Sequence, residues 1–123
     1  MGCEEISIVI VLSFVLGITK GIQDKLQFHF HKSIFRNLGN WWNPEMSWRN
    51  KWKNGDRKQG ERFFLSSTLL VSLTDAWHFF GLLRNFSVFV AIALLEDWKL
   101  IFFYPLFFAT FHIFFTHIFK RAT

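Results

Sequence analysis

The sequence predicts an all-α integral membrane protein. We expect a helical bundle of four, or alternatively three, transmembrane helices with an amphipathic interfacial helix and a basic loop rich in Trp. Of the 123 residues, 51% are hydrophobic and 18 are Phe, which is more apolar surface than a soluble fold of this size buries. The basic residues are also clustered, because ten of the 14 Lys and Arg residues lie between the first long apolar run and the second. These ten are Lys20, Lys25, Lys32, Arg36, Arg49, Lys51, Lys53, Arg57, Lys58 and Arg62. Cations gather beside membrane spans, so the sequence indicates one membrane domain over residues 1–123.

The first apolar run predicts a transmembrane helix over residues 6–22. Residues 6–18 (ISIVIVLSFVLGI) are almost wholly apolar. A span needs about 20 residues, so the helix must continue to residue 22.

Residues 23–62 are predicted to form an amphipathic helix followed by a basic, Trp-rich cytoplasmic loop. Apolar residues recur at a spacing of four, and basic residues follow the opposite side of the same helix. The apolar side holds Ile22, Leu26, Phe30, Ile34 and Leu38, and the basic side holds Lys25, His29, Lys32 and Arg36. Such a helix lies naturally in the membrane interface. The alternative is a helix that covers the other helices as a soluble-like cap.

The loop that follows mixes tryptophans with cations. Trp41, Trp42, Trp48 and Trp52 are interleaved with Arg49, Lys51 and Lys53, and Gly39, Pro44, Gly55 and Gly60 interrupt any long helix. One interpretation is an aromatic belt that anchors the loop at the interface. A sharper one is a phosphate pocket, in which Asn50 or Ser47 orients an anion that basic side chains neutralise. The predicted head-group ligands are Lys25, His29, Lys32, Arg36, Arg49, Lys51, Lys53 and Arg62. Stacking on single-stranded nucleic acid is the least favoured alternative, and no nucleic acid is expected as a partner.

The second apolar run predicts the central helix of the bundle over residues 63–83. Its 21 residues (FFLSSTLLVSLTDAWHFFGLL) would span about 30 Å. Asp75 and His78 lie near its middle, where a carboxylate costs roughly 2.5–3.5 kcal/mol when it faces lipid. We therefore expect Asp75 to face other helices or a wet cavity.

Two further apolar segments complete the predicted bundle. Residues 86–98 predict a short third crossing or a re-entrant piece, and residues 100–119 predict the last helix. Four crossings place the basic loop in the cytoplasm and Lys120-Arg121 outside. If residues 86–98 do not cross, three crossings return Lys120-Arg121 to the cytoplasm.

Polar residues at helical spacing predict a site inside the bundle. Thr68 and Ser72 share a face with Asp75 and His78 on the central helix, and His112 lies at mid-membrane depth on the last helix. The predicted polar core is Thr68, Ser72, Asp75, His78 and His112. Its possible roles are a proton relay, a metal or haem site, or a hydrogen-bonded pin that fixes helix register.

Chemistry at this polar core has few candidates. The histidines do not form the boxes of di-iron oxygenases, and bulky Phe residues flank the pair that haem would need, so we expect no metal and no cofactor. Asp75 and His78 are the candidate catalytic pair of an enzyme acting on a lipid phosphate, with the basic loop as its anion clamp.

Several short stretches resemble a family of small uncharacterised membrane proteins of Bacteroidetes-type bacteria. They are residues 21–29 (GIQDKLQFH), 32–35 (KSIF), 42–44 (WNP), 47–51 (SWRNK), 54–56 (NGD) and 73–78 (LTDAWH). The resemblance implies a multi-pass protein of the bacterial inner membrane and implies no particular activity.

The predicted function is a structural or complex-forming membrane subunit that binds anionic lipid head groups. One alternative is the enzyme acting on a lipid phosphate, and another is a metal-binding or haem-binding subunit that uses His78 and His112. The expected partners are membrane lipids, together with further copies of the chain or other membrane subunits.

Overall fold

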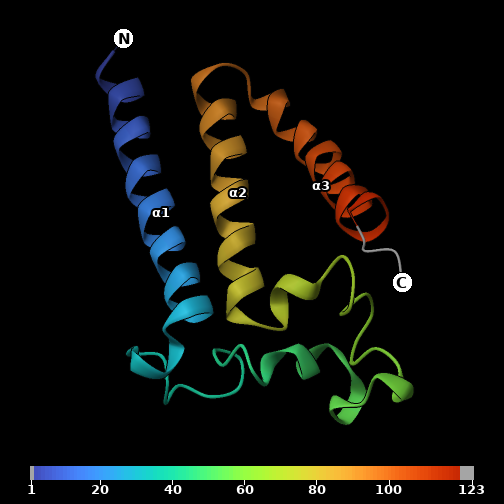
Figure 1. Ribbon diagram of the computed structural model, residues 1–123. Coiled ribbons are helices and arrows are strands. Elements are labelled where there is room, and N and C mark those ends of the chain that lie inside the picture. The colour runs from blue at the N-terminus through green and yellow to red at the C-terminus, as the bar shows by residue number, and fades with distance from the viewer. Residues whose placement is uncertain (1, 120–123) are drawn as a thin grey trace. The chain divides into compact units, whose positions relative to one another are not determined.

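The computed structural model describes residues 2–119, and this part of the chain is all-helical (Figure 1). It holds three α-helices, α1 (Cys3–Phe28), α2 (Ala76–Leu95) and α3 (Tyr104–Ile113), with turns and short 3₁₀ segments between them and no β-strand. Helices α1 and α2, of 26 and 20 residues, are long and apolar enough to cross a membrane. The all-α prediction is confirmed, whereas a bundle of four spans is not supported.

The chain divides into two compact units. We call Ser13–Asn85 the polar unit, because it contains the whole basic segment between α1 and α2. The described residues of Met1–Leu12 and Phe86–Thr123 form the apolar unit.

Helix α1 is longer than predicted, and the separate amphipathic helix is wrong. The helix continues to Phe28, and only a 3₁₀ turn, Phe30–Lys32, follows it. The Ser33 hydroxyl donates a hydrogen bond to the Phe30 carbonyl at 2.6 Å and accepts one from the Phe35 amide at 3.2 Å. These side-chain bonds compete with helical ones, so the 3.6-residue pattern of residues 22–38 does not become a helix over its full length.

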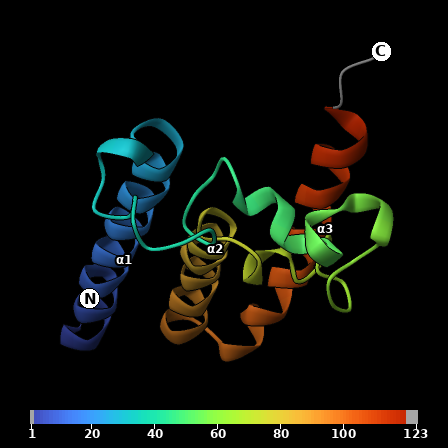
Figure 2. The same ribbon diagram turned by 90° about the horizontal axis from the view of Figure 1, so that it is seen from below.

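The polar unit has a small core at the end of α1 and the start of α2. Leu26, Phe30 and Ala76 are buried there, packed against Ile22, Phe35, Trp41, Trp42 and Phe80. The carbonyl of Trp41 accepts the Ala76 amide at 2.8 Å, and its indole donates to the Leu73 carbonyl at 3.1 Å. Figure 2 shows the connecting segment passing the first turns of α2, where these bonds form. Two of the predicted belt tryptophans, Trp41 and Trp42, therefore pack within the polar unit.

Helix α2 begins thirteen residues later than the predicted central helix. Residues 63–75 form turns and a 3₁₀ segment, Val71–Leu73, and Leu65 adopts a left-handed conformation with φ of 61°. Asp75 is the N-cap residue, and its Oδ1 accepts the His78 backbone amide at 2.8 Å. A cap carboxylate satisfies an amide that the helix leaves unpaired. The helix over residues 63–83 and the short crossing over 86–98 are thus replaced by one α-helix, Ala76–Leu95.

A glycine on α2 lets α1 approach closely within the polar unit. The Gln23 side chain is buried, and its Nε2 donates to the Trp77 carbonyl at 3.0 Å. A Cβ on Gly81 would lie 2.8 Å from that Nε2. In a Gln23→Ala background, Gly81→Ala is expected to stabilise the protein by about 0.5–1 kcal/mol, because alanine favours the helix.

In the wild-type protein, where Gln23 is present, Gly81→Ala is expected to give no stabilisation or to destabilise the fold. The added Cβ displaces the hydrogen bond from Gln23 to the Trp77 carbonyl, which is worth about 1 kcal/mol. A double-mutant cycle by chemical unfolding measures the coupling, which we expect to be about 1 kcal/mol. Additive effects of the two substitutions would contradict the contact.

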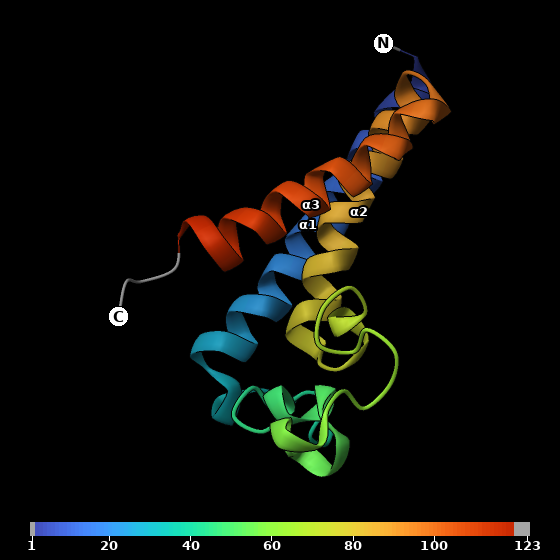
Figure 3. The same ribbon diagram turned by 90° about the vertical axis from the view of Figure 1, so that its right-hand side faces the viewer.

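The apolar unit consists of the end of α2, a turn and a broken third helix. The Asp97 carboxylate accepts the Lys99 amide at 3.0 Å, and from this turn the chain continues as 3₁₀ (Trp98–Phe103), α3 (Tyr104–Ile113) and π (Phe114–Ile118) segments. Figure 3 shows α3 leaving the turn at the end of α2. The Tyr104 ring lies edge-on to Phe86 and Phe89, with centroids 5.2 and 5.4 Å away. The predicted last helix over residues 100–119 is therefore helical but not a uniform α-helix.

Candidate anion-binding site

Residues 51–62 form a hairpin-like turn closed by an isolated β-bridge, which we call the basic hairpin, and it carries several of the cations of the polar unit. The Lys53 amide donates to the Gly60 carbonyl at 3.0 Å, and the Arg62 amide donates to the Lys51 carbonyl at 2.9 Å. Trp52 and Glu61 face each other as an antiparallel pair between these bonds. Asn54, Gly55 and Gly60 have φ of 53°, 73° and 86°, so the turn uses residue types that tolerate left-handed backbone.

A short 3₁₀ helix, Ser47–Lys51, leads into the hairpin and is fixed on both sides. The Asn50 amide donates to the Thr74 carbonyl at 2.9 Å, directly before the start of α2. The Ser66 hydroxyl donates to the Lys51 carbonyl at 2.7 Å. These hydrogen bonds connect the 3₁₀ helix to the segment that precedes α2 and fix the position of its backbone.

The hairpin and the 3₁₀ helix enclose a cavity of about 380 Å³, which we call the arginine cavity. It is lined by Asn40, Met46, Arg49, Asn50, Trp52, Asn54, Gly55 and Arg62. The eight lining residues include two arginines and three asparagines, and none of the eight is acidic. Arg groups bind carboxylate and phosphate through paired N–H donors, so this lining suits an anion.

The Arg49 side chain contacts the Trp48 ring and passes close to Gly55. Its guanidinium carbon lies 5.0 Å from the centroid of the Trp48 ring. A Cβ on Gly55 would lie 3.5 Å from the Cβ of Arg49, so the arginine stem passes close to the glycine. The adjacent indole stabilises the guanidinium through its π-face and limits its rotamers before any ligand arrives.

A second cavity of about 280 Å³, the His78 cavity, lies in the same unit. It is lined by Gln27, Pro44, Ser47, Trp48, Lys51, Asp75, Trp77 and His78. The His78 Nδ1 lies 2.9 and 2.8 Å from the two carboxylate oxygens of Asp75, whose side chain is buried. The helix Ser47–Lys51 contributes residues to both cavities: Arg49 and Asn50 line the arginine cavity, and Ser47, Trp48 and Lys51 line the His78 cavity.

The predicted head-group ligands occupy different places on the polar unit. Arg49 and Arg62 line the arginine cavity together with Asn50, one of the two residues predicted to orient the anion. Lys51 and Ser47 instead line the His78 cavity. The remaining predicted cations are exposed and line neither cavity: Lys25, His29, Lys32, Arg36 and Lys53.

Sequence reasoning did not identify Asn40, Asn54 and Trp52 as members of a common site. The Asn54-Gly55 pair predicts a turn. Such a turn folds the chain back on the segment that mixes tryptophans with cations, and this was the one signal that Asn54 and Trp52 could belong to a common site. It did not reveal that Asn40 would join them from outside the hairpin.

The predicted polar core does not form as a single row. Thr68 lies exposed in a turn and Ser72 lies in the 3₁₀ segment before α2, because residues 63–75 are not α-helical. His112 is exposed on α3 in the apolar unit, where its ring stacks on Phe108 with centroids 6.4 Å apart. Only Asp75 and His78 are brought into contact. Across residues 2–119, no three His, Cys, Asp or Glu side chains gather to form a metal site.

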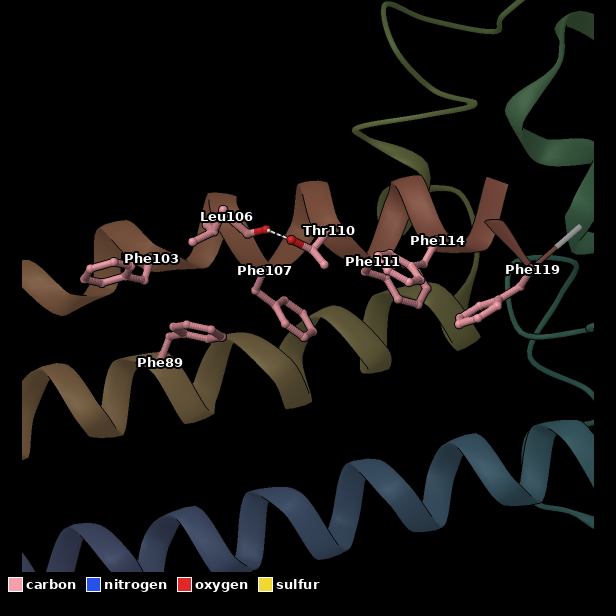
Figure 4. A pocket seen from close by; sticks show the side chains of 8 residues that line it. All are labelled: Phe89, Phe103, Leu106, Phe107, Thr110, Phe111, Phe114 and Phe119. Atoms are coloured by element: carbon pink, nitrogen blue, oxygen red, sulfur yellow. Dashed lines mark hydrogen bonds between the residues drawn. The ribbon is translucent and has the colours of Figure 1, made fainter. Parts of the chain in front are cut away.

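The apolar unit has a cavity of a different kind, shown in Figure 4. It measures about 560 Å³ and is lined by Phe89, Phe103, Leu106, Phe107, Thr110, Phe111, Phe114 and Phe119. The Thr110 hydroxyl donates to the Leu106 carbonyl of its own helix at 2.8 Å, and the Phe89 and Phe107 rings point into the space between their helices. This lining has no titratable group, so it offers packing and no acid–base chemistry.

Acidification is expected to open the turn beside the basic hairpin. The Ser67 hydroxyl donates to the Glu61 carboxylate and holds the pKa of Glu61 below its ordinary value of 4.5, with a further bond from the Leu65 amide at 3.1 Å. A lowered pKa means that the stabilisation is complete at neutral pH and is lost as the pH falls through the lowered value.

An NMR titration of the Leu65 amide should therefore show a midpoint below pH 4.5. In Ser67→Ala the midpoint should move up toward that ordinary value. A wild-type midpoint at or above 4.5 would show that the Ser67 bond does not control this carboxylate.

Comparisons with protein-family models, with curated proteins and with solved structures found no match to this chain. The resemblance to small membrane proteins of Bacteroidetes-type bacteria therefore stays a prediction.

Proposed function

We propose that the protein is a small membrane protein whose polar unit binds an anionic lipid head group in the arginine cavity. The observation that carries this proposal is the lining of that cavity, in which Arg49 and Arg62 meet three Asn side chains without a carboxylate. Its volume of about 380 Å³ falls within the range of small-molecule sites.

The lining matches the chemistry of a phosphodiester head group. Guanidinium groups neutralise the phosphate and donate paired hydrogen bonds to its oxygens. The Asn40 side-chain amide can donate to, or accept from, the polar part of the head group. The Asn50 amide already donates to the Thr74 carbonyl, and the Asn54 amide donates to the Gln59 side chain at 2.9 Å. The Trp52 ring adds an apolar wall with a polar edge, as tryptophans do at membrane interfaces.

The two candidate spans, α1 and α2, support a position of this cavity at a membrane surface. We infer that α1 and α2 cross the bilayer and that residues 98–119 form a third crossing. The basic segment then lies in the cytoplasm, as the bias of cations toward the cytoplasm favours. The predicted side of Lys120 and Arg121 concerns residues outside the described part of the chain. The family resemblance supports a bacterial inner membrane, with further copies of the chain or other membrane subunits as partners.

Cysteine labelling checks this topology, because Cys3 is the only cysteine of the chain and is exposed. A membrane-impermeant maleimide applied to intact cells is expected to label Cys3. In Cys3→Ser/Lys58→Cys, the hairpin cysteine should react only after the membrane is opened. Labelling of both positions from the same side would contradict the proposed crossings.

Reconstitution tests the proposed function. The purified chain in nanodiscs or micelles is titrated with short-chain phosphatidylglycerol or with short-chain phosphatidylcholine. We expect saturable binding of the anionic lipid that weakens as salt is added, and much weaker binding of the zwitterionic lipid. Equal affinity for the two lipids would contradict recognition of an anionic head group.

A further inference from the structure

We propose that the His78 cavity is a catalytic site that hydrolyses carboxylic esters of lipids at the membrane surface. His78 is the general base, and Asp75 is its positioning residue. This activity is additional to head-group binding. The lipid nature of the substrate rests on the proposed membrane placement, whereas the assignment of the base does not.

The Asp75 carboxylate fixes both the orientation and the tautomer of the His78 ring. It lies 2.8–2.9 Å from Nδ1 through both oxygens, and its Oδ1 also accepts the His78 backbone amide at 2.8 Å. A carboxylate only accepts hydrogen bonds, so Nδ1 carries the proton of the neutral ring. The lone pair of the neutral imidazole is then on Nε2, the atom that can take a proton from a molecule in the cavity.

The cavity also supplies groups for the charge that develops during ester hydrolysis. Lys51 and Ser47 are both among the residues that line it, and Ser47 is 5% exposed. The Lys51 Nζ lies 5.8 Å from the centroid of the neighbouring Trp52 ring. Donors that are already in place before reaction stabilise an oxyanion without a cost of reorganisation. Lys51 is fixed at its backbone, because its carbonyl accepts the Ser66 hydroxyl and the Arg62 amide.

The proposed reaction needs only water as its second reactant. The water oxygen attacks the ester carbonyl carbon while one of its protons passes to Nε2 of His78, and the carbonyl electron pair moves onto oxygen beside Lys51. The tetrahedral intermediate then collapses, the bond from carbon to the alkoxy oxygen breaks, and the proton on Nε2 passes to the leaving oxygen. The products are a carboxylic acid and an alcohol, and His78 returns to its neutral form.

The surroundings of the cavity favour an interfacial ester. Trp48 and Trp77 contribute to its lining while remaining 50% and 38% exposed. Trp77 is the second residue of α2, so the cavity lies at the beginning of a candidate span. Tryptophans at the end of a span occupy the head-group level of the bilayer, between its apolar core and the water.

Asparagine at position 75 separates catalysis from helix capping. Asn caps helices about as well as Asp does, so Asp75→Asn should leave the unfolding midpoint unchanged. Its amide cannot hold Nδ1–H as the carboxylate does, so we expect kcat to fall about 100-fold with little change in KM.

The test measures hydrolysis of p-nitrophenyl butyrate and release of fatty acid from phosphatidylglycerol by the full chain in mixed micelles. We expect turnover of both esters by the wild type and a loss of about 100-fold in His78→Ala. Added imidazole should restore part of the rate of His78→Ala, which a purely structural defect would not allow. His112→Ala, which alters an exposed histidine of the other unit, should keep the wild-type rate.

Three results would overturn the proposal: no turnover by the wild type, unchanged turnover in His78→Ala, or unchanged kcat in Asp75→Asn. Head-group binding is measured separately with phosphatidylglycerol and phosphatidylcholine. Failure of the catalytic proposal is therefore distinguishable from failure of the binding proposal.

Discussion

Replacing Leu26 by alanine is expected to lower the free energy of unfolding of the polar unit by about 2–5 kcal/mol. Leu26 is completely buried in the core that joins the end of α1 to the start of α2. Removing its side chain leaves a cavity beside Phe30 and Ala76, and so few buried residues can only partly fill it. A loss of this size is a large share of the roughly 5–15 kcal/mol that stabilises a typical domain.

Denaturant unfolding in detergent, followed by tryptophan fluorescence, measures this effect because Trp41 and Trp42 pack on the same core. Leu38→Ala is the matched control. The same atoms are removed there from a side chain that is 55% exposed, so its effect should stay within about 0.5 kcal/mol. Equal losses for the two variants would show that Leu26 does not form the core of the unit.

Loss of both guanidinium groups from the arginine cavity is expected to weaken binding of an anionic head group about 100-fold. Arg49→Gln/Arg62→Gln keeps polar side chains at both positions but removes two charge-assisted hydrogen bonds of about 1.5 kcal/mol each. Binding of short-chain phosphatidylglycerol to the two proteins provides the measurement.

The matched control is Arg36→Gln/Lys58→Gln, which removes the same net charge from exposed positions outside the cavity. All four side chains are exposed, but only Arg49 and Arg62 line the cavity. The affinity of the control should fall only a few-fold, because a cation that does not contact the ligand acts through a charge that salt screens. Equal loss in the two double variants would mean that overall charge, and not the cavity, determines binding.

Periodicity and charge were sufficient to predict the fold class and part of the site. Long apolar runs predict helices because backbone groups in lipid must be satisfied within the segment, and α1 forms over the first of those runs. An anion pocket in which Arg49, Lys51, Lys53 and Arg62 neutralise the charge, and Asn50 or Ser47 orients the ligand, was predicted from the cation-rich loop and stays a prediction. Of these residues, Arg49, Asn50 and Arg62 lie around one cavity, and Ser47 and Lys51 lie around another.

The start of α2 could not be read from hydrophobicity. The turns over residues 63–75 are themselves rich in apolar residues, so they extend the hydrophobic run without extending the helix. From the hydrophobic run alone, Asp75 is predicted to lie in the middle of a membrane helix. In the structure it is instead the N-cap residue of α2. Since Asp is a favoured N-cap residue, the alternative reading was available in the same residues.

The tryptophan residues posed a second ambiguity. An indole beside a basic residue is typical of a membrane interface, but the same residue also fills small cores. Trp41 and Trp42 pack inward because the Trp41 carbonyl accepts the first amide of α2, and this pairing joins positions 35 residues apart. The meeting of Ser47 and Lys51 with His78 has the same origin, since it depends on how the connecting segment folds back on α2.

A head group bound in the arginine cavity is detected most directly by NMR of the full chain in micelles, titrated with short-chain phosphatidylglycerol. The Trp52 indole signal and the side-chain amide signals of Asn40 and Asn54 are expected to shift and to saturate together, because all three residues line that cavity. The Trp98 indole, which belongs to the apolar unit, should not follow the same curve. Saturable shifts confined to Trp48 and Trp77, with Trp52 unchanged, would contradict binding in the arginine cavity.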